Sequence, residues 1–330
     1  MNQTSNGLSG ATPASASVAG ILFAVGAATI FSINDVAIKW LSDGYPLHQI
    51  TFIRSLVGML VILAVFVPLE GSYSALRTRR PGFHLLRGAI LVTANMAFYP
   101  GLATLPLGEA TAIYFVSPLF ISALSVLLLG DRVGPRRWAA VAAGMIGVVI
   151  VIQPGSAAFQ VAALLPLIGA FFYALLQITS RKIGVTESAS TMAFYLNLFF
   201  ILFSGAVGLA FGDGRYAGSD DASLEFLLRA WVWPTPGDFL LLSLMGVIGS
   251  TGAYCVSQAY RIAQPGLIAP FEYVGMPLAV FWSVAIWGDW PDAISWIGIA
   301  LIAGAGIFVF WREARLGRQQ RLRTPAARGR

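Results

Sequence analysis

The stretch LLLGDRVGPRRW, residues 127–138, has a counterpart near the other end of the chain, AIWGDWPDAISW at residues 285–296. A shift of 158 residues superimposes three identical pairs: Gly130 and Gly288, Asp131 and Asp289, and Trp138 and Trp296. Each stretch closes one apolar segment and opens the next. The match therefore predicts a duplicated unit within the chain.

A second match marks the opening of each copy. A shift of 142 residues lays FSINDVAIKWL (31–41) on YALLQITSRKI (173–183). It aligns two polar pairs: Asp35 with Gln177, and Lys39 with Arg181. The two shifts differ by 16 residues, which a long loop predicted at about 212–237 can largely absorb. The expected repeats cover residues 18–153 and 161–311.

The composition is that of a membrane protein. Of the 330 residues, 57% are hydrophobic and 11% are charged, and the mean hydropathy is +0.75. Uncharged runs of about 20 residues recur, each long enough to cross about 30 Å of hydrocarbon. We expect an all-α membrane protein with ten transmembrane helices arranged as two inverted five-helix repeats. The helices are predicted at 18–41, 47–67, 83–104, 109–129, 135–152, 161–183, 188–211, 238–262, 265–287 and 293–311.

Basic residues set the expected orientation. Of the 21 Lys and Arg residues, only Arg215 and Arg229 fall in the odd-numbered loops, while Lys39 and Arg54 lie within helices. The others occupy the even-numbered loops and the C-terminal tail. Because cytoplasmic loops collect Lys and Arg, both termini are predicted to be cytoplasmic, in a bacterial inner membrane. This pattern accounts for the net charge of +6 without a nucleic-acid partner.

The odd number of helices in each repeat has a functional meaning. The second copy must enter the membrane with the opposite orientation, and inverted repeats of this kind are typical of secondary transporters. A duplication retained in a receptor, scaffold or membrane enzyme is the alternative. A transporter should gather polar residues near mid-membrane on both halves, whereas an enzyme should gather them at one interface.

Charged side chains within the apolar helices are the first candidates for a functional site, because a charge at mid-membrane costs about 2.5–3.5 kcal/mol. Asp35 and Lys39 are one helical turn apart and can neutralise each other. Together with Arg54 and Glu109 they are expected towards the outer side. Lys39 either snorkels to the interface or belongs to the site. Asp35 with Arg54 is either a structural ion pair or a gate or substrate contact.

Glu272 is the other carboxylate predicted inside the membrane, between Pro270 and Pro277. The prolines remove backbone hydrogen bonds, which a membrane helix tolerates beside protein or a water-filled cavity. A carboxyl group shielded from water can exchange protons near neutral pH, which suits proton coupling. Binding of a cationic group and a structural pair with Arg261 are the alternatives.

Uncharged residues complete the candidate substrate-binding or coupling set. Aromatic and amide side chains serve packing more often than ligand binding, but together they suit a planar heteroaromatic solute with polar substituents. They are Asn95, Tyr99, Tyr114, Gln177, Tyr195, Tyr254, Gln258 and Trp282, with Tyr173, Asn197 and Tyr273 considered beside them. Small residues at four-residue spacing, such as Ala139, Ala143 and Gly147, allow close helix contacts, either within the bundle or in a homodimer.

The chain lacks the motifs of several enzyme classes. It has one cysteine, Cys255, and two separated histidines, so no disulfide or metal site is expected. It contains no GxxxxGK[ST] or GxSxG motif. We expect no enzyme activity and no cofactor. The expected partners are a small-molecule substrate, the lipid bilayer and, unless the protein is a facilitator, a proton or ion gradient. Residues 1–17 are predicted to be a disordered tail and residues 312–330 a basic, disordered tail.

The duplicated layout resembles a known family. The segments LLLGDRVGPRRWAAVAAGMIGVVIV and AIWGDWPDAISWIGIALIAGAGIFVFWRE, which close the two halves, are similar to EamA-type permeases of the drug/metabolite transporter superfamily. The resemblance covers residues 18–311. In that family the acidic residue after the glycine is commonly glutamate, whereas here Asp131 and Asp289 stand in its place.

Three segments resemble one branch of this family: INDVAIKWL, HQITFIRSLVG and IAPFEYVGMPLAVFWSVAIWGDWPD. That branch is associated with uptake of S-adenosylmethionine or riboflavin. The resemblance implies a solute permease with a central cavity, importing a polar heteroaromatic or zwitterionic metabolite. Export of amino acids, metabolites or drugs is the alternative.

Overall fold

The structure is a computed structural model that describes residues 13–70, 73–78, 80–130, 134–155, 160–183, 189–262 and 271–323. The described residues form helices and no strands, and nine helices among them are long and apolar enough to cross a membrane. A shorter apolar stretch, Gly275–Trp287, follows residues 263–270, which lie outside the described part. The protein is therefore a multi-pass, all-helical membrane protein.

The helices of the first half run in the order predicted. Their bounds are α1 (Pro13–Leu41), α2 (Leu47–Val61), η1 (Ile62–Phe66), α3 (Val67–Glu70), η2 (Tyr73–Leu76), α4 (Pro81–Thr104), α5 (Leu107–Tyr114), α6 (Ser117–Leu129) and α7 (Pro135–Ile152). The elements α2, η1 and α3 form one continuous span, and η1 is a π-helical segment within it.

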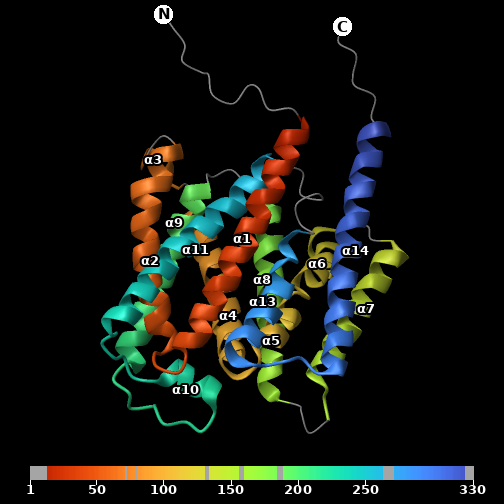
Figure 1. The fold of residues 1–330 in the computed structure, drawn as a ribbon. Helices are drawn as coiled ribbons and strands as arrows, with labels where there is room; N and C mark the ends of the chain where they lie inside the picture. Colours follow the sequence, from red (N-terminus) through yellow and green to blue (C-terminus); the bar gives the residue numbers. More distant parts are fainter. Residues whose placement is uncertain are drawn as a thin grey trace, which may run out of the picture.

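The second half contains the remaining elements. Their bounds are η3 (Val161–Ala163), α8 (Leu164–Ile183), α9 (Ala189–Phe211), α10 (Ala222–Leu228), α11 (Pro236–Ile262), α13 (Gly275–Trp282), η4 (Ser283–Trp287) and α14 (Ala293–Arg323). The first and last helices begin and end on the same face of the molecule, and α10 lies at the opposite face (Figure 1).

Glycine ends the matching helices of the two halves. Gly130 follows α6 with φ 72° and Gly288 follows η4 with φ 74°, both in the left-handed region that favours glycine. The next residue of the first motif, Asp131, lies outside the described residues, whereas Asp289 is described. The two glycines of the repeated motif therefore have the same backbone conformation.

Three boundaries differ from the sequence prediction. Residues 13–17 belong to α1, and α14 continues through residues 312–323, which were predicted to be disordered. The stretch 312–323 is rich in Arg, Gln and Leu, which are good helix formers, and a basic helix end is favoured by the helix dipole. The predicted loop at 212–237 also contains a helix, α10, whose first turn is capped by the Asp221 side chain through the N–H of Leu224.

The helices pair across the two halves. The helix α1 packs along α11 and α4 packs along α8, while α2 contacts α9 and α7 contacts α14. The largest apolar core lies where α1, α2, α4, α5, α13 and α14 meet, and Leu47, Leu102, Leu107 and Ile302 are fully buried in it. The polar residues considered below are therefore held between helices from both halves.

A glycine contact joins the last helix of each half. A side chain carbon added to Gly147 of α7 would lie 2.8 Å from the carbonyl oxygen of Gly298 in α14, and one added to Gly298 would lie 2.6 Å from that of Gly147. No larger residue fits this seam without moving a backbone. Of the two uses predicted for Gly147, packing within the bundle is the one seen here.

Candidate functional site

Two apolar segments are interrupted by a turn at equivalent positions. The first break is the turn at Phe115 and Val116, between α5 and α6. The second is the turn at residues 273–274, before α13. Phe115 and Tyr273 are 158 positions apart, the same shift that superimposes the repeated glycine motif. The predicted span at 109–129 is confirmed as one apolar segment, with a turn inside it that the prediction did not include. The prolines beside Glu272 had already indicated an interrupted helix within 265–287.

Proline explains where the helices break. The ring nitrogen of Pro118 cannot donate to the carbonyl of residue 114, and that of Pro277 cannot donate to the carbonyl of residue 273. Discontinuous helices are tolerated in membranes where protein or a cavity surrounds the broken turn. In transporters such breaks commonly line the substrate site.

The two breaks touch each other. The Tyr273 hydroxyl donates a hydrogen bond to the carbonyl oxygen of Phe115 at 3.1 Å, and the two rings lie 5.1 Å apart. Tyr273 is buried and its hydroxyl lies against Gly306 of α14, where no side chain would fit. Tyr273, considered as a ligand-binding residue, therefore has a packing role between the breaks.

A group of charged and polar residues lies beside the first break, on three helices of the first half. Asp35 of α1 interacts electrostatically with Arg54 of α2. The Arg54 guanidinium carbon lies 5.4 Å from the ring centre of Tyr99 in α4 and 5.9 Å from that of Phe200 in α9. Asp35 thus faces Arg54.

Tyrosines continue this group towards the second half. The Tyr114 ring, at the end of α5, lies 5.7 Å from the Tyr173 ring in α8. Gln177 donates to the Tyr173 hydroxyl at 2.8 Å, and Tyr173 is within electrostatic range of Glu272. We call the residues Asp35, Arg54, Tyr99, Tyr114, Tyr173, Gln177 and Glu272 the central cluster. Asn95 lies one turn before Tyr99 on α4 and is half-buried.

The central cluster is partly accessible. Five of its residues are half-buried, Gln177 is exposed and Tyr99 is buried; the five are Asp35, Arg54, Tyr114, Tyr173 and Glu272. Charged side chains of membrane helices usually face the interior of the bundle or a water-filled space.

Other predicted site residues lie at the face opposite the two ends of the chain. The sequence predicts this face to be the outer one, and it is called the outer face below. Lys39 donates to the backbone carbonyls of Leu102, at 2.8 Å, and of Leu105, at the end of α4. A cation at a helix C-terminus is favourable, so Lys39 ties α1 to α4 in place of the expected pairing with Asp35 or simple snorkelling. Glu109 accepts a hydrogen bond from the Ser295 hydroxyl at 3.1 Å.

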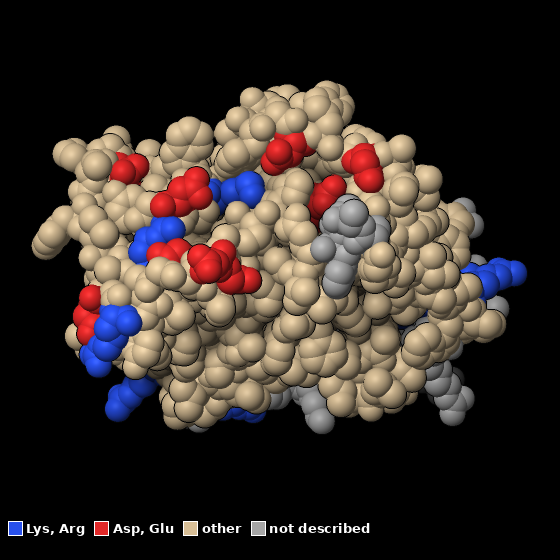
Figure 2. Space-filling view, turned by 90° about the horizontal axis from the view of Figure 1, so that it is seen from below, with Lys and Arg blue, Asp and Glu red and all other residues tan. Residues whose placement is uncertain are grey.

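Acidic side chains gather on this outer face (Figure 2). Asp43 and Asp289 lie close enough to Lys39 to interact with its charge, and Lys39 lies 5.6 Å from the ring centre of Trp287. Gln153 donates to Asp292 at 2.9 Å. This hydrogen bond, together with one from the N–H of Ser295, lowers the pKa of Asp292 below its usual range.

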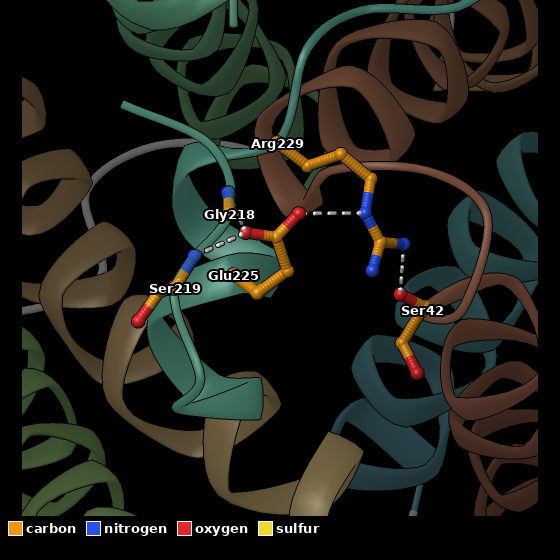
Figure 3. A network of polar contacts seen from close by, with 5 residues as sticks. All are labelled: Ser42, Gly218, Ser219, Glu225 and Arg229. Carbon is orange, nitrogen blue, oxygen red and sulfur yellow. Dashed lines mark hydrogen bonds and ion pairs between the residues drawn. The ribbon is translucent and has the colours of Figure 1, made fainter. Parts of the chain in front are cut away.

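The segment that contains α10 closes over the turn between α1 and α2 (Figure 3). The Glu225 carboxylate accepts from the N–H groups of Gly218 and Ser219 at 2.7 and 3.1 Å, which lowers its pKa. Its other oxygen lies 3.4 Å from the Arg229 guanidinium, which in turn donates to the Ser42 carbonyl at 2.9 Å. The outer end is thus held by a connected polar network.

Two of the remaining candidates, Tyr195 and Tyr254, lie against η2 and η1, away from the central cluster. The Tyr195 hydroxyl donates to the Leu76 carbonyl at 2.9 Å, and Gln258 donates to the Tyr254 hydroxyl at 2.6 Å while Tyr254 stacks on Phe66. The Trp282 indole donates to Ser32 of α1 at 3.2 Å. The side chain of Arg261 and all of Pro270 lie outside the described residues. Asn34, which the sequence prediction left out, is next to Asp35 in the chain.

The N-terminal part of the chain matches a family profile. Residues 18–153 match the EamA-like transporter family. The chain is 30% identical to a riboflavin transporter of Rhizobium johnstonii over 97% of its own length and 98% of that protein. It is 28% identical to an S-adenosylmethionine uptake transporter of Rickettsia prowazekii, over 86% and 90% of the two chains.

Two further comparisons bear on direction and fold. The chain is 25% identical to a pseudopaline exporter of Pseudomonas aeruginosa, over 87% of its length and 94% of that protein. One solved crystal structure superposes on 92% of this chain and 99% of its own, with a TM-score of 0.62 at 19% identity. At that identity the likeness concerns the fold alone.

Proposed function

Because this chain belongs to the EamA-like transporter family, we propose that it imports a polar heteroaromatic or zwitterionic metabolite, and that the central cluster binds this substrate. Transport, and not enzyme catalysis, is the activity of the family. Relatives named for riboflavin and for S-adenosylmethionine both carry planar heteroaromatic solutes with polar substituents. The substrate class proposed here is the one that these two solutes share.

The composition of the central cluster carries the proposal. It places Asp35, Arg54 and Glu272 beside the rings of Tyr99, Tyr114 and Tyr173. Tyrosine rings can stack on a planar solute, and charges of both signs can hold a zwitterionic one. Membrane proteins retain such charges where they serve a substrate or ion pathway.

We also propose alternating access between two inverted five-helix repeats. Three observations support it: the two helix breaks at equivalent positions, the pairing of α1 with α11 and of α4 with α8, and the ends of the chain on one face. The helix α1 corresponds to α8 of the other repeat, and α4 corresponds to α11. The α1–α11 pair and the α4–α8 pair are therefore equivalent under exchange of the repeats. Ends on one face require an even number of crossings, which Gly275–Trp287 would supply as the tenth.

The proposed setting is a bacterial inner membrane with both termini in the cytoplasm. The named relatives are bacterial, and the acidic outer face opposite the termini agrees with the predicted excess of Lys and Arg on the cytoplasmic side. A homodimer remains a prediction from the sequence.

Reconstituted full-length protein tests the transport proposal. Proteoliposomes are loaded in turn with buffer or solute and offered radiolabelled riboflavin, S-adenosylmethionine and glucose, which has neither a heteroaromatic ring nor a charge. We expect saturable uptake of one of the two heteroaromatic solutes and none of glucose. Flux of glucose alone, or of no solute, would contradict the substrate class.

Export is the second candidate, because one relative is named as an exporter. The same vesicles distinguish it when an accessible cysteine is placed in either tail to report orientation. An importer should concentrate solute inside the vesicles through the molecules that are inserted with their outer face towards the external solution. Concentration only through molecules of the opposite orientation would favour export.

Glu272 is proposed to couple transport to protons. Its carboxyl group lies near Tyr173, within the membrane and beside the second break. In the same vesicles, Glu272→Gln should remove the stimulation of uptake by an imposed pH gradient while residual exchange at equal pH survives. A variant that keeps the pH stimulation would assign coupling elsewhere. Asp220→Asn, in the exposed outer loop, is the matched control.

A further inference from the structure

A non-helical segment crosses the ends of three long apolar helices at the outer face. Residues 230–235 join α10 to α11, and we call them the strap. The N–H of Trp231 donates to the carbonyl of Gly212, directly after α9, at 3.0 Å. The side-chain amide of Gln49, in the first turn of α2, donates to the carbonyl of Val232 at 2.6 Å and accepts from its N–H at 3.2 Å. The backbone of the strap is therefore fixed to α2 and to the end of α9.

These contacts set the depth of the strap in the membrane. The apolar span Leu47–Glu70 begins two residues before Gln49. The span Ser190–Phe211 ends one residue before Gly212, and the span Pro236–Val256 begins directly after the strap. A span of about 20 apolar residues covers the hydrocarbon, so its ends lie in the headgroup layer. The strap is tied to three such ends and therefore lies at the level of the membrane surface.

The two tryptophans of the strap have different surroundings. The Trp231 ring lies 5.5 Å from that of Phe52 and 5.8 Å from that of His48, both on α2. A side chain carbon added to Gly208 of α9 would collide with the same ring. Trp233, two residues further on, is 94% exposed. Trp231 thus fixes the strap to the helix bundle, while the Trp233 side chain extends away from it.

Apolar side chains are also exposed on the helices that flank the strap. Phe239 and Leu240 are exposed near the start of α11, and Leu209, near the end of α9, is 91% exposed. All three belong to apolar spans, whose exposed surface faces hydrocarbon. The strap, with Val232 exposed as well, therefore continues a lipid-facing surface up to its edge.

The loop that precedes α10 has a different exposed surface. Tyr216 is accompanied there by Asp213, Arg215, Asp220 and Asp221, all of them exposed. Charged side chains favour water, whereas the headgroup layer accommodates both the apolar ring and the N–H of an indole. The strap is therefore suited to the membrane surface, and residues 212–221 are suited to water.

We propose that the strap is a membrane-surface contact, in which Trp233 and Val232 enter the headgroup layer of the phospholipid leaflet at the outer face. The partner is the interfacial layer of the bilayer itself, recognised through apolar side chains and not through charge. The contact goes beyond the transport proposal and does not depend on which solute is carried. It holds the outer loop against the membrane beside α9 and α11.

A fluorescent probe at position 233 tests the contact in full-length protein reconstituted into phosphatidylcholine vesicles. The environment-sensitive fluorophore NBD is attached to Trp233→Cys in a Cys255→Ser background, and the vesicles contain lipid with a nitroxide either on the headgroup or at the end of the acyl chain. We expect the headgroup nitroxide to quench the probe at least about twofold more than the terminal one, because tryptophan positions of this kind lie at headgroup depth. Iodide in the water on both sides should quench it little.

The matched control is the same probe on Tyr216→Cys. It should be quenched strongly by iodide and weakly by both nitroxide lipids. Trp233 is 94% exposed and Tyr216 is 52% exposed in the protein alone. If both positions were in water, iodide would therefore quench position 233 at least as strongly as position 216.

A second measurement needs no label. Phosphatidylcholine brominated near the carbonyl end of its acyl chains should quench the intrinsic fluorescence of the unmodified protein more than that of Trp233→Leu. The difference between the two proteins reports the contribution of Trp233.

Three results would overturn the proposal. Iodide quenching at position 233 as strong as at position 216 would place the strap in water. A probe at position 233 that is shielded from iodide and from both nitroxide lipids would identify a protein partner, such as a second copy of the chain. Equal quenching of the unmodified protein and Trp233→Leu by the brominated lipid would show that the native indole does not reach the bilayer.

Discussion

The two sequence repeats bring one carboxylate each to the central cluster, but from different elements. In the first, Asp35 lies on the opening helix and Tyr114 precedes the helix break. In the second, Gln177 takes the place of Asp35, and Glu272 takes the place of Tyr114. The backbone repeats its broken helix while the charge changes position. The asymmetry of the proposed site therefore lies in its side chains. A bound solute would meet different side chains from the first repeat and from the second.

The largest effect should come from removing the carboxylate of the first repeat. Asp35→Asn removes the opposite charge with which Arg54 interacts, and an uncompensated charge within a membrane helix is costly. We expect the rate of uptake to fall at least about tenfold, which corresponds to a rise of about 1.4 kcal/mol or more in the activation free energy of transport. Initial uptake rates in proteoliposomes, normalised to the amount of folded protein, provide the measurement.

Two double variants decide between a structural pair and a functional contact at Asp35. Combining Asp35→Asn with Arg54→Gln removes both charges and should restore thermal stability without restoring uptake. Combining Asp35→Asn with Gln177→Glu moves the carboxylate to its counterpart in the second repeat. Recovery of uptake in the first double variant would show that the pair is only structural.

The contact between the two breaks should give the next largest effect. Gly306→Ala pushes a methyl group against the Tyr273 hydroxyl, and overpacking of this kind costs about 1–3 kcal/mol. Denaturant or thermal unfolding should show the loss, and Tyr273→Phe in the same chain should return part of it. Gly304→Ala, on the same helix with open space around it, is the control and should be neutral or slightly stabilising. Equal losses in both alanine variants would contradict the packing role of Tyr273.

A smaller effect is expected at the outer end. Arg229→Ala removes the contacts with Glu225 and the Ser42 carbonyl, and a partly exposed charge pair contributes about 1 kcal/mol or less. Tm should fall slightly. If this end must open during transport, uptake limited by that opening should become faster. Arg215→Ala changes an exposed pair within the loop and should leave both quantities unchanged. A fall as large as that of Gly306→Ala would mean that the outer network dominates stability.

The smallest effect concerns acid pH. The pKa values of Asp292 and Glu225 are lowered in the folded protein, so both groups stabilise it above their ordinary range of about 4. This contribution is lost as the pH falls through the lowered pKa values, because the unfolded state, whose pKa values are higher, binds protons more readily than the folded state. Tm in detergent should be level from pH 7 to about pH 5 and decline below pH 4. Gln153→Ala should make that decline shallower, and an unchanged slope would remove Asp292 as a contributor.

Sequence patterns predicted most of the helices and several of the polar neighbours. Hydropathy and turn residues place the spans because lipid requires long apolar helices. Asp35, Arg54 and Glu272 stand out because charge is costly in lipid. The break before Pro118 was missed because a hydropathy window does not register a single turn, whereas Pro277 had been noted as a residue that removes a backbone hydrogen bond.

Other features depend on tertiary contacts that no local pattern reveals. Lys39 binds backbone carbonyls of α4, and any sequence there would supply the same carbonyl groups. Tyr195 and Tyr254 resemble Tyr99 and Tyr114 in sequence context, but they lie against η2 and η1. The helix beyond residue 311 was missed because its charge outweighed its helix propensity in the prediction.

The glycine seam between α7 and α14 limits how the two halves can move. Backbones in direct contact at Gly147 and Gly298 can neither slide past one another nor separate without opening a void. If the two halves rock against each other during transport, the glycine seam is the pivot. The displacement of each helix then grows with its distance from the seam. The helices α1, α2, α9 and α11, which do not pack on the seam, would sweep the widest arc.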